Sequence, residues 1–104
     1  MEIDPTDVEV PPYLPDAPTV RKDIAHYHAE IQRFDREVGR LLDRLEAAGE
    51  LENTIVVVSG DHGWPFPRGK SHLYDAGTHV PLAVRWPEQV PAGRRVTDFV
   101  SLID

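Results

Sequence analysis

The longest regular pattern in this 104-residue chain is a stripe of apolar side chains between residues 19 and 48. The side chains recur at alternating spacings of three and four, which places them on one face of an α-helix. They are Ile24, Tyr27, Ile31, Phe34, Val38, Leu41 and Leu45. We expect this helix to begin at Thr19, a residue type favoured at the N-cap, and to stop at Gly49, which can adopt the left-handed conformation that closes a helix. Gly39 inside the helix indicates close packing.

The segment before this helix is rich in proline. Prolines fix φ and remove backbone donors, so residues 1–18 are predicted to form an extended arm that must lie against another surface. The prolines are Pro5, Pro11, Pro12, Pro15 and Pro18.

Two short apolar segments after the helix predict strands. Residues 54–58 are β-branched and apolar on both faces, which is typical of a central strand in a parallel sheet covered by helices. Residues 81–86 begin with Pro81, which predicts a strand whose start lies at the sheet edge. Residues 96–104 are expected to be helical or extended. The order of helix, strand, loop and strand predicts an α/β fold, and part of the sheet must come from outside these residues.

The charge and composition exclude several classes of function. The chain has 18 acidic and 11 basic residues and a net charge of −7, so we expect neither nucleic acid nor an anionic membrane as a partner. There is no cysteine, so a metal site must use oxygen or nitrogen ligands. No apolar run approaches the ~20 residues of a membrane span, and the acidic N-terminus lacks the basic and apolar regions of a signal peptide. These features do not indicate a compartment.

Asp61, His62 and Gly63 follow directly on the first predicted strand. The carboxyl ends of strands in open α/β sheets are where ligands and catalytic groups collect. The Asp61 carboxylate suits a hard divalent cation, and His62 can add a nitrogen ligand. The alternative interpretation is that Asp61 caps a turn and His62 is an ordinary loop histidine.

Lys70, His72 and His79 add cationic and imidazole groups to the same region. Lys70 can neutralise an anionic oxygen beside a metal, as sulfuryl or phosphoryl transfer requires. Alternatively it is a solvated surface lysine. His72 and His79 can serve as acids or support metal ligands, but loop histidines more often form local hydrogen bonds, so both rank below Lys70.

Three aromatic residues accompany the candidate loop. Trp64, Phe66 and Trp86 can line a sugar-binding face or anchor the loop by burying their rings. We favour anchoring.

The succession of these motifs resembles the sulfatase family over residues 11–104. The resemblance is carried by residues 54–63, Gly69-Lys70, Tyr74-Asp75, Gly77, Val80-Pro81-Leu82 and Arg85-Trp86-Pro87. It extends upstream through Phe34-Asp35, Val38-Gly39 and Leu41-Leu42, and downstream through residues 101–104. The loop 64–68 and residues 12–16 are most similar to the heparan N-sulfatase (sulfamidase) branch.

The resemblance implies an alkaline-phosphatase-like α/β fold, a divalent cation that is usually calcium, and a formylglycine nucleophile made from Cys or Ser. Residues 19–104 would then be part of a sulfatase catalytic domain acting on sulfated carbohydrates or other sulfate esters. Asp61 and His62 match metal ligands, although Asn is commoner where His62 stands. Lys70 matches the basic residue that contacts metal and sulfate, although the sulfamidase branch often has Arg there. His72 is assigned to substrate binding, and Asp75 stands where Glu is frequent.

Other family motifs are absent from the 104 residues. The modification motif, Cys or Ser followed two residues later by Pro and four later by Arg, does not occur, nor do the paired Asp ligands that open the domain. We expect the nucleophile in a missing N-terminal portion, with the remainder of the domain as partner. This chain alone should be inactive. Two alternatives stay open: a phosphoesterase or phosphonate hydrolase of the same superfamily, and a non-catalytic helical interaction module.

Overall fold

A computed structural model describes residues 3–103. Residues 1 and 2 of the predicted arm and residue 104 of the predicted C-terminal segment lie outside the described residues. The chain forms two compact units, Met1–Gly49 and Glu50–Asp104. The proline-rich segment and the long helix therefore belong to one unit, and both predicted strands belong to the other.

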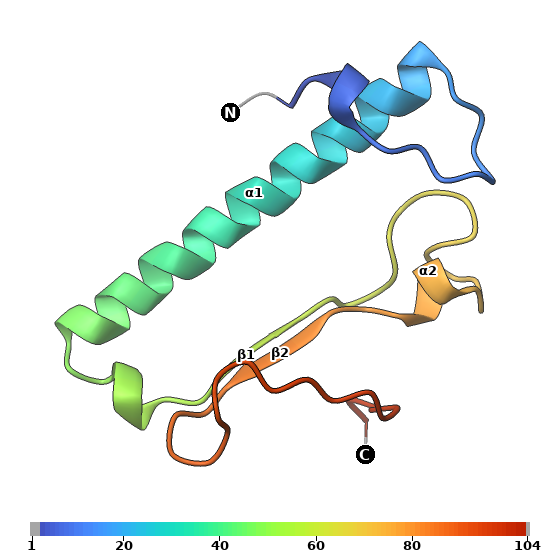
Figure 1. Cartoon of the computed structure of the whole chain (residues 1–104). Helices are drawn as coiled ribbons and strands as arrows, with labels where there is room; N and C mark the ends of the chain where they lie inside the picture. Colours follow the sequence, from blue (N-terminus) through green and yellow to red (C-terminus); the bar gives the residue numbers. More distant parts are fainter. Residues whose placement is uncertain (1–2, 104) are drawn as a thin grey trace. The chain divides into compact units, whose positions relative to one another are not determined.

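The first unit is dominated by helix α1, Pro18–Ala47 (Figure 1). Its N-cap is Ala17, without a side-chain cap, so the prediction of Thr19 as N-cap is wrong. Pro18 occupies the first turn, where its fixed φ suits a helix and its missing N–H costs nothing. The predicted end is confirmed: Gly49 has φ +71° and its N–H donates to the carbonyl of Glu46 at 2.9 Å.

Gly39 does not pack closely as predicted. An ideal Cβ built at Gly39 meets no atom within 4 Å in the described part of the chain.

The proline-rich segment folds against the start of α1 and is not fully extended. It contains the 3-10 helix η1, Pro5–Asp7, capped by the Asp4 side chain, which accepts from the Thr6 N–H at 2.8 Å. The Arg21 guanidinium donates to the Val8 carbonyl at 3.0 Å and pairs with the Asp16 carboxylate. The proline-rich arm was predicted to lie against another surface, and these contacts show that this surface is the start of α1. The buried apolar residues of this unit are Val8, Ile24 and Ala25.

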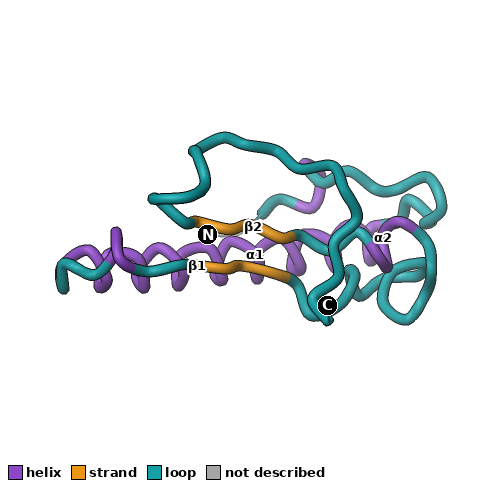
Figure 2. Tube along the Cα trace, turned by 90° about the horizontal axis from the view of Figure 1, so that it is seen from below, coloured by secondary structure: helices purple, strands orange, loops and turns teal. Residues whose placement is uncertain are grey.

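The second unit contains two short strands joined by a long loop. Its elements are η2 (Leu51–Asn53), β1 (Val56–Ser59), α2 (Asp75–Thr78) and β2 (Leu82–Arg85). Both strands were predicted, and β1 and β2 lie side by side (Figure 2). They pair antiparallel, however, with Val57 opposite Val84 and Ser59 opposite Leu82. A parallel pair requires a long crossover, usually an α-helix, and the only helix in this connection is the four-residue α2.

One face of this sheet is uncovered. Because opposite residues of an antiparallel pair point to the same side, Val57 and Val84 share a face, and their exposed fractions are 57% and 44%. The predicted burial of β1 on both faces therefore does not occur in the described residues. The same face carries Ile55, Leu82 and Trp86, all exposed.

The chain beyond β2 is irregular. The carbonyl of Trp86 accepts from the N–H groups of Gln89 and Val90, which forms a turn. Residues 96–103 contain neither helix nor strand, so the helical alternative for this segment is wrong. Across residues 3–103, no helix combines the length and the apolar character needed to cross a membrane.

Candidate functional site

Asp61 and His62 lie just beyond the end of β1. The ladder ends where the Gly60 N–H donates to the carbonyl of Pro81 at 3.2 Å. Next to it, His62 Nε2 lies 3.7 Å from Asp61 Oδ1. The structure therefore brings together the two predicted metal ligands.

The orientation of the His62 ring suits metal binding. His62 Nδ1 lies 2.6 Å from the Gly63 carbonyl oxygen. A carbonyl oxygen only accepts, so Nδ1 carries the proton in this contact, and the neutral ring keeps its lone pair on Nε2. The 3.7 Å between Nε2 and the Asp61 oxygen is short enough for one cation to contact both, at about 2.0–2.6 Å from each.

These two side chains do not by themselves make a metal site. The described residues contain no group of three or more acidic, histidine or cysteine side chains that could hold a metal ion. The oxygen and nitrogen donors of Asp61 and His62 fit a divalent cation, but further ligands must come from elsewhere.

The loop after Gly63 folds back on itself and carries Lys70. The Lys70 N–H donates to the carbonyl of Trp64 at 2.8 Å, and the Gly69 N–H donates to Phe66 at 2.9 Å. The backbone of Lys70 thus returns to within two residues of His62. The Lys70 side chain is exposed and forms no ion pair with Asp61 among the described residues. The structure therefore places Lys70 on a segment next to Asp61 and His62 but does not show its side chain in contact with either.

The other histidines of this region form local contacts. His72 Nδ1 lies 3.1 Å from the Lys70 carbonyl oxygen, and His79 Nδ1 lies 3.4 Å from Asp75 Oδ1 on α2. Neither is brought to Asp61. His72, however, forms its hydrogen bond with Lys70, the residue that was predicted to contact the sulfate.

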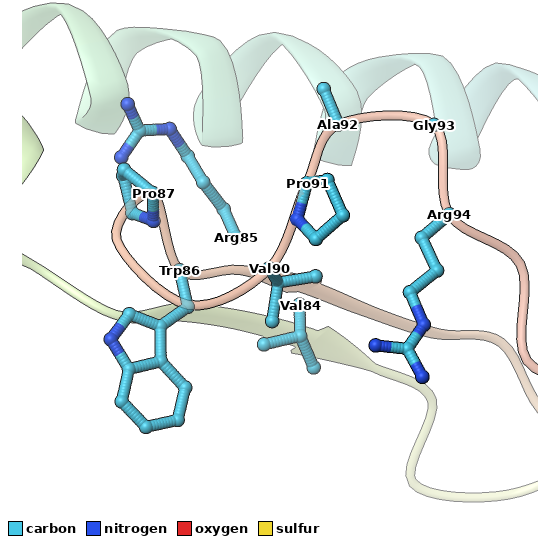
Figure 3. A pocket seen from close by; sticks show the side chains of 9 residues that line it. All are labelled: Val84, Arg85, Trp86, Pro87, Val90, Pro91, Ala92, Gly93 and Arg94. Atoms are coloured by element: carbon cyan, nitrogen blue, oxygen red, sulfur yellow. The ribbon is translucent and has the colours of Figure 1, made fainter.

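The aromatic residues divide between the two ends of the sheet. The ring centroids of Trp64 and Phe66 lie 4.6 Å apart within the loop, with the ring planes tilted by 53°, and this contact favours the anchoring role. Trp86 follows the end of β2 and lines an open hollow of about 440 Å³ with Val84 and Arg94 (Figure 3). Because β2 runs antiparallel to β1, this hollow and Asp61 lie at opposite ends of the sheet.

Sequence reasoning gave Gly63 a sharp turn of the backbone but missed the close packing around three glycines. A side chain on Gly63, Gly69 or Gly77 would overlap backbone atoms. A Cβ on Gly63 would meet Gly77, one on Gly77 would meet Gly69, and one on Gly69 would meet Trp64. Their positions in the sequence could have indicated this packing. Each glycine lies within a few residues of a candidate polar residue, and none belongs to a dipeptide typical of a turn.

Comparisons with known proteins identify the family. The sulfatase family model matches residues 4–104. The chain is 41% identical over 102 residues to human N-sulphoglucosamine sulphohydrolase, which covers 97% of this chain and 20% of that protein. It is 38% identical over 99 residues to the ulvan-active sulfatase of Formosa agariphila, covering 95% of this chain and 17% of the relative.

A third relative is the N-acetylglucosamine-6-O-sulfatase of Bacteroides thetaiotaomicron, 38% identical over 74 residues, which covers 64% of this chain and 13% of that protein. The chain thus spans a fifth or less of the length of these relatives. The family match extends over nearly every residue, including the strand, the loop and the polar residues described above, and we conclude that this chain belongs to the sulfatase family.

Proposed function

We propose that this chain is part of a sulfatase catalytic domain of the alkaline-phosphatase-like fold, which hydrolyses sulfate esters or N-sulfates of sugars. The observation that carries the proposal is the pair of Asp61 and His62 at the end of β1. The Nδ1 contact of His62 with the Gly63 carbonyl leaves Nε2 free beside the Asp61 carboxylate. Two ligand atoms 3.7 Å apart just beyond a strand can contribute to a divalent cation site, which needs further ligands from elsewhere.

Each residue of the site has a separate role in this proposal. Asp61 and His62 would hold a divalent cation, which we infer to be calcium and which would supply positive charge next to the sulfate. Lys70 contacts a sulfate oxygen and stabilises the charge that builds up as the S–O or S–N bond breaks. His72 supports substrate binding through its hydrogen bond to the Lys70 carbonyl.

We infer that the nucleophile comes from outside these 104 residues. None of the 104 residues is a cysteine, and no serine begins the modification motif. We infer that a formylglycine lies in the larger part of the domain, together with the remaining metal ligands.

The exposed apolar surfaces of both units support a larger domain. In the sheet, Val57 and Val84 are about half exposed, and on α1 the stripe residues Ile31, Phe34 and Leu41 have exposed fractions of 47–55%. Covering such surfaces is favourable at about 25 cal/mol per Å² of apolar area removed from water. We propose that the remainder of the sulfatase domain covers them.

The proposed substrate is a sulfated carbohydrate. The names of the three relatives refer to ulvan, N-sulphoglucosamine and N-acetylglucosamine-6-O-sulfate chemistry. The similarity of the loop 64–68 to the heparan N-sulfatase branch leads us to propose an N-sulfated glucosamine.

Kinetics on the complete sulfatase that carries these residues test the proposal. We expect turnover of sulfated glucosamines and of an aryl sulfate, with loss of activity after chelation of calcium. An aryl phosphate is the matched control. Faster turnover of the phosphate than of any sulfate would replace the sulfatase with the phosphoesterase alternative.

The helical interaction module is favoured only by the exposed stripe on α1. Light scattering on the 104-residue chain distinguishes the two explanations. A discrete oligomer whose formation Phe34→Ala abolishes would support the module.

A further inference from the structure

We propose that Gly77 is a positioning residue for the site of the proposed function, on which this inference rests. Together with Gly63 and Gly69, it holds the backbone of Lys70 in a fixed place beside the Asp61–His62 end of β1. Gly77 lies on α2, which the sequence motifs for metal and sulfate binding do not include.

The three glycines come from three segments that meet at their backbones. An ideal Cβ at Gly63 would lie 2.5 Å from the Cα of Gly77, and one at Gly77 would lie 2.4 Å from the carbonyl oxygen of Gly69 and 2.1 Å from that of His72. Each obstacle is a backbone atom, which cannot move aside as a flexible side chain can. A methyl group at Gly77 therefore has to displace the segment 69–72, which contains Lys70.

The requirement for glycine here is one of space and not of backbone conformation. The described glycines with positive φ are Gly49 and Gly93, neither of which belongs to this cluster. Two non-glycine residues, Arg68 (φ 64°) and Ser71 (φ 68°), instead adopt the left-handed conformation on either side of Gly69-Lys70. Such residues keep this conformation only where surrounding contacts enforce it, often at functional sites.

Hydrogen bonds connect the cluster to both halves of the candidate site. The Trp64 N–H donates to the Ala76 carbonyl on α2 at 3.1 Å, and the Trp64 carbonyl accepts from the Lys70 N–H at 2.8 Å. Trp64 directly follows Gly63, so α2, the end of β1 and Lys70 share one backbone hydrogen-bond network. Gly77 acts on the site through this network and not through contact with substrate.

The test is a double-mutant cycle in the complete sulfatase that carries these residues, with Gly77→Ala, Lys70→Ala and the double variant. We expect Gly77→Ala to reduce kcat/KM about 100-fold, the effect of a displacement of roughly 1 Å in an active site. If Gly77 acts through Lys70, its substitution adds little once Lys70→Ala is present. Gly39→Ala, in the other compact unit, is the matched control, because among the described residues a Cβ there meets no atom within 4 Å outside its own helix, and it should leave kcat/KM unchanged.

Additive effects of Gly77→Ala and Lys70→Ala would overturn the proposal, as would a Gly77→Ala enzyme indistinguishable from Gly39→Ala.

If Gly77→Ala does not fold, amide hydrogen exchange in the wild-type protein decides. The Trp64 and Lys70 amides should then be as protected as those of β1, and rapid exchange of either would refute the positioning role. Should the wild-type enzyme not hydrolyse sulfates, the proposed function fails, while hydrogen exchange at Lys70, compared between wild type and Gly77→Ala, still tests the positioning role.

Discussion

The backbone N–H of Lys70 donates a hydrogen bond of 2.8 Å to the carbonyl of Trp64, which closes the loop between them. This bond returns the chain to a point two residues beyond His62. The loop residue Lys70 and the two candidate metal ligands at the end of β1 therefore belong to one local structure.

Replacing Lys70 with alanine should lower kcat/KM of the complete sulfatase by about 100- to 1000-fold, the usual effect of removing one group that stabilises developing charge. Lys70→Arg keeps the charge and should retain more activity. Steady-state kinetics check both values. Lys22→Ala, on the exposed side of α1, is the control, and an equal loss in that variant would contradict the assignment.

Replacing Asp61 with asparagine should weaken calcium binding to the complete sulfatase by about 10-fold or more, because it removes a charged oxygen ligand. Isothermal titration calorimetry measures this change. Asp98→Asn, at an exposed position in the irregular C-terminal segment, should have no effect.

Calcium affinity should also fall as the pH is lowered, because a protonated imidazole cannot coordinate a metal. His62→Asn should make the affinity less dependent on pH. An unchanged pH dependence in this variant would mean that His62 is not a ligand.

The packing of the arm on α1 should weaken at low pH. The hydrogen bond from Arg21 lowers the pKa of the Asp16 carboxyl below its ordinary value of 3.8. A carboxyl whose pKa is lowered by folding stabilises the folded state above its unfolded pKa, and this stabilisation is lost as the pH falls through the lowered value. NMR titration of Asp16 should show the lowered pKa in the wild type and an ordinary one in Arg21→Gln. The Arg33→Gln variant, whose partner is Glu30, should leave the Asp16 titration unchanged.

Two glycines of the first unit should respond oppositely to alanine. Gly49→Ala should destabilise the protein by about 1–2 kcal/mol, because Gly49 has φ +71° and alanine disfavours that conformation. Gly39→Ala should stabilise it by up to about 1 kcal/mol, because alanine is the better helix former and there is space for its methyl group. Urea denaturation followed by circular dichroism measures both changes. Equal changes in the free energy of unfolding for the two substitutions would show that the backbone angle φ does not decide the effect of alanine on stability.

Local sequence patterns predicted where the helix and the strands lie better than they predicted how the strands pair. The period of the apolar stripe correctly indicated α1, and Gly49 marked its end, since both depend on residues within a turn or two of one another. The start was wrong because Pro18 in the first turn replaced a side-chain cap at Thr19. The two strands were found, but their pairing was not, because strand direction depends on the path of the whole connecting loop.

By itself, the sequence determined the helix, the two strands, the absence of thiolate ligands and the order of polar residues that leads to the sulfatase family. Only the tertiary structure decided that the strands are antiparallel, that His62 presents Nε2 beside Asp61, and that Gly63, Gly69 and Gly77 meet. The physical reason is the range of the interactions. Helical periodicity and helix termination depend on local interactions. The contact of the three glycines instead depends on excluded volume between segments that are separated along the chain.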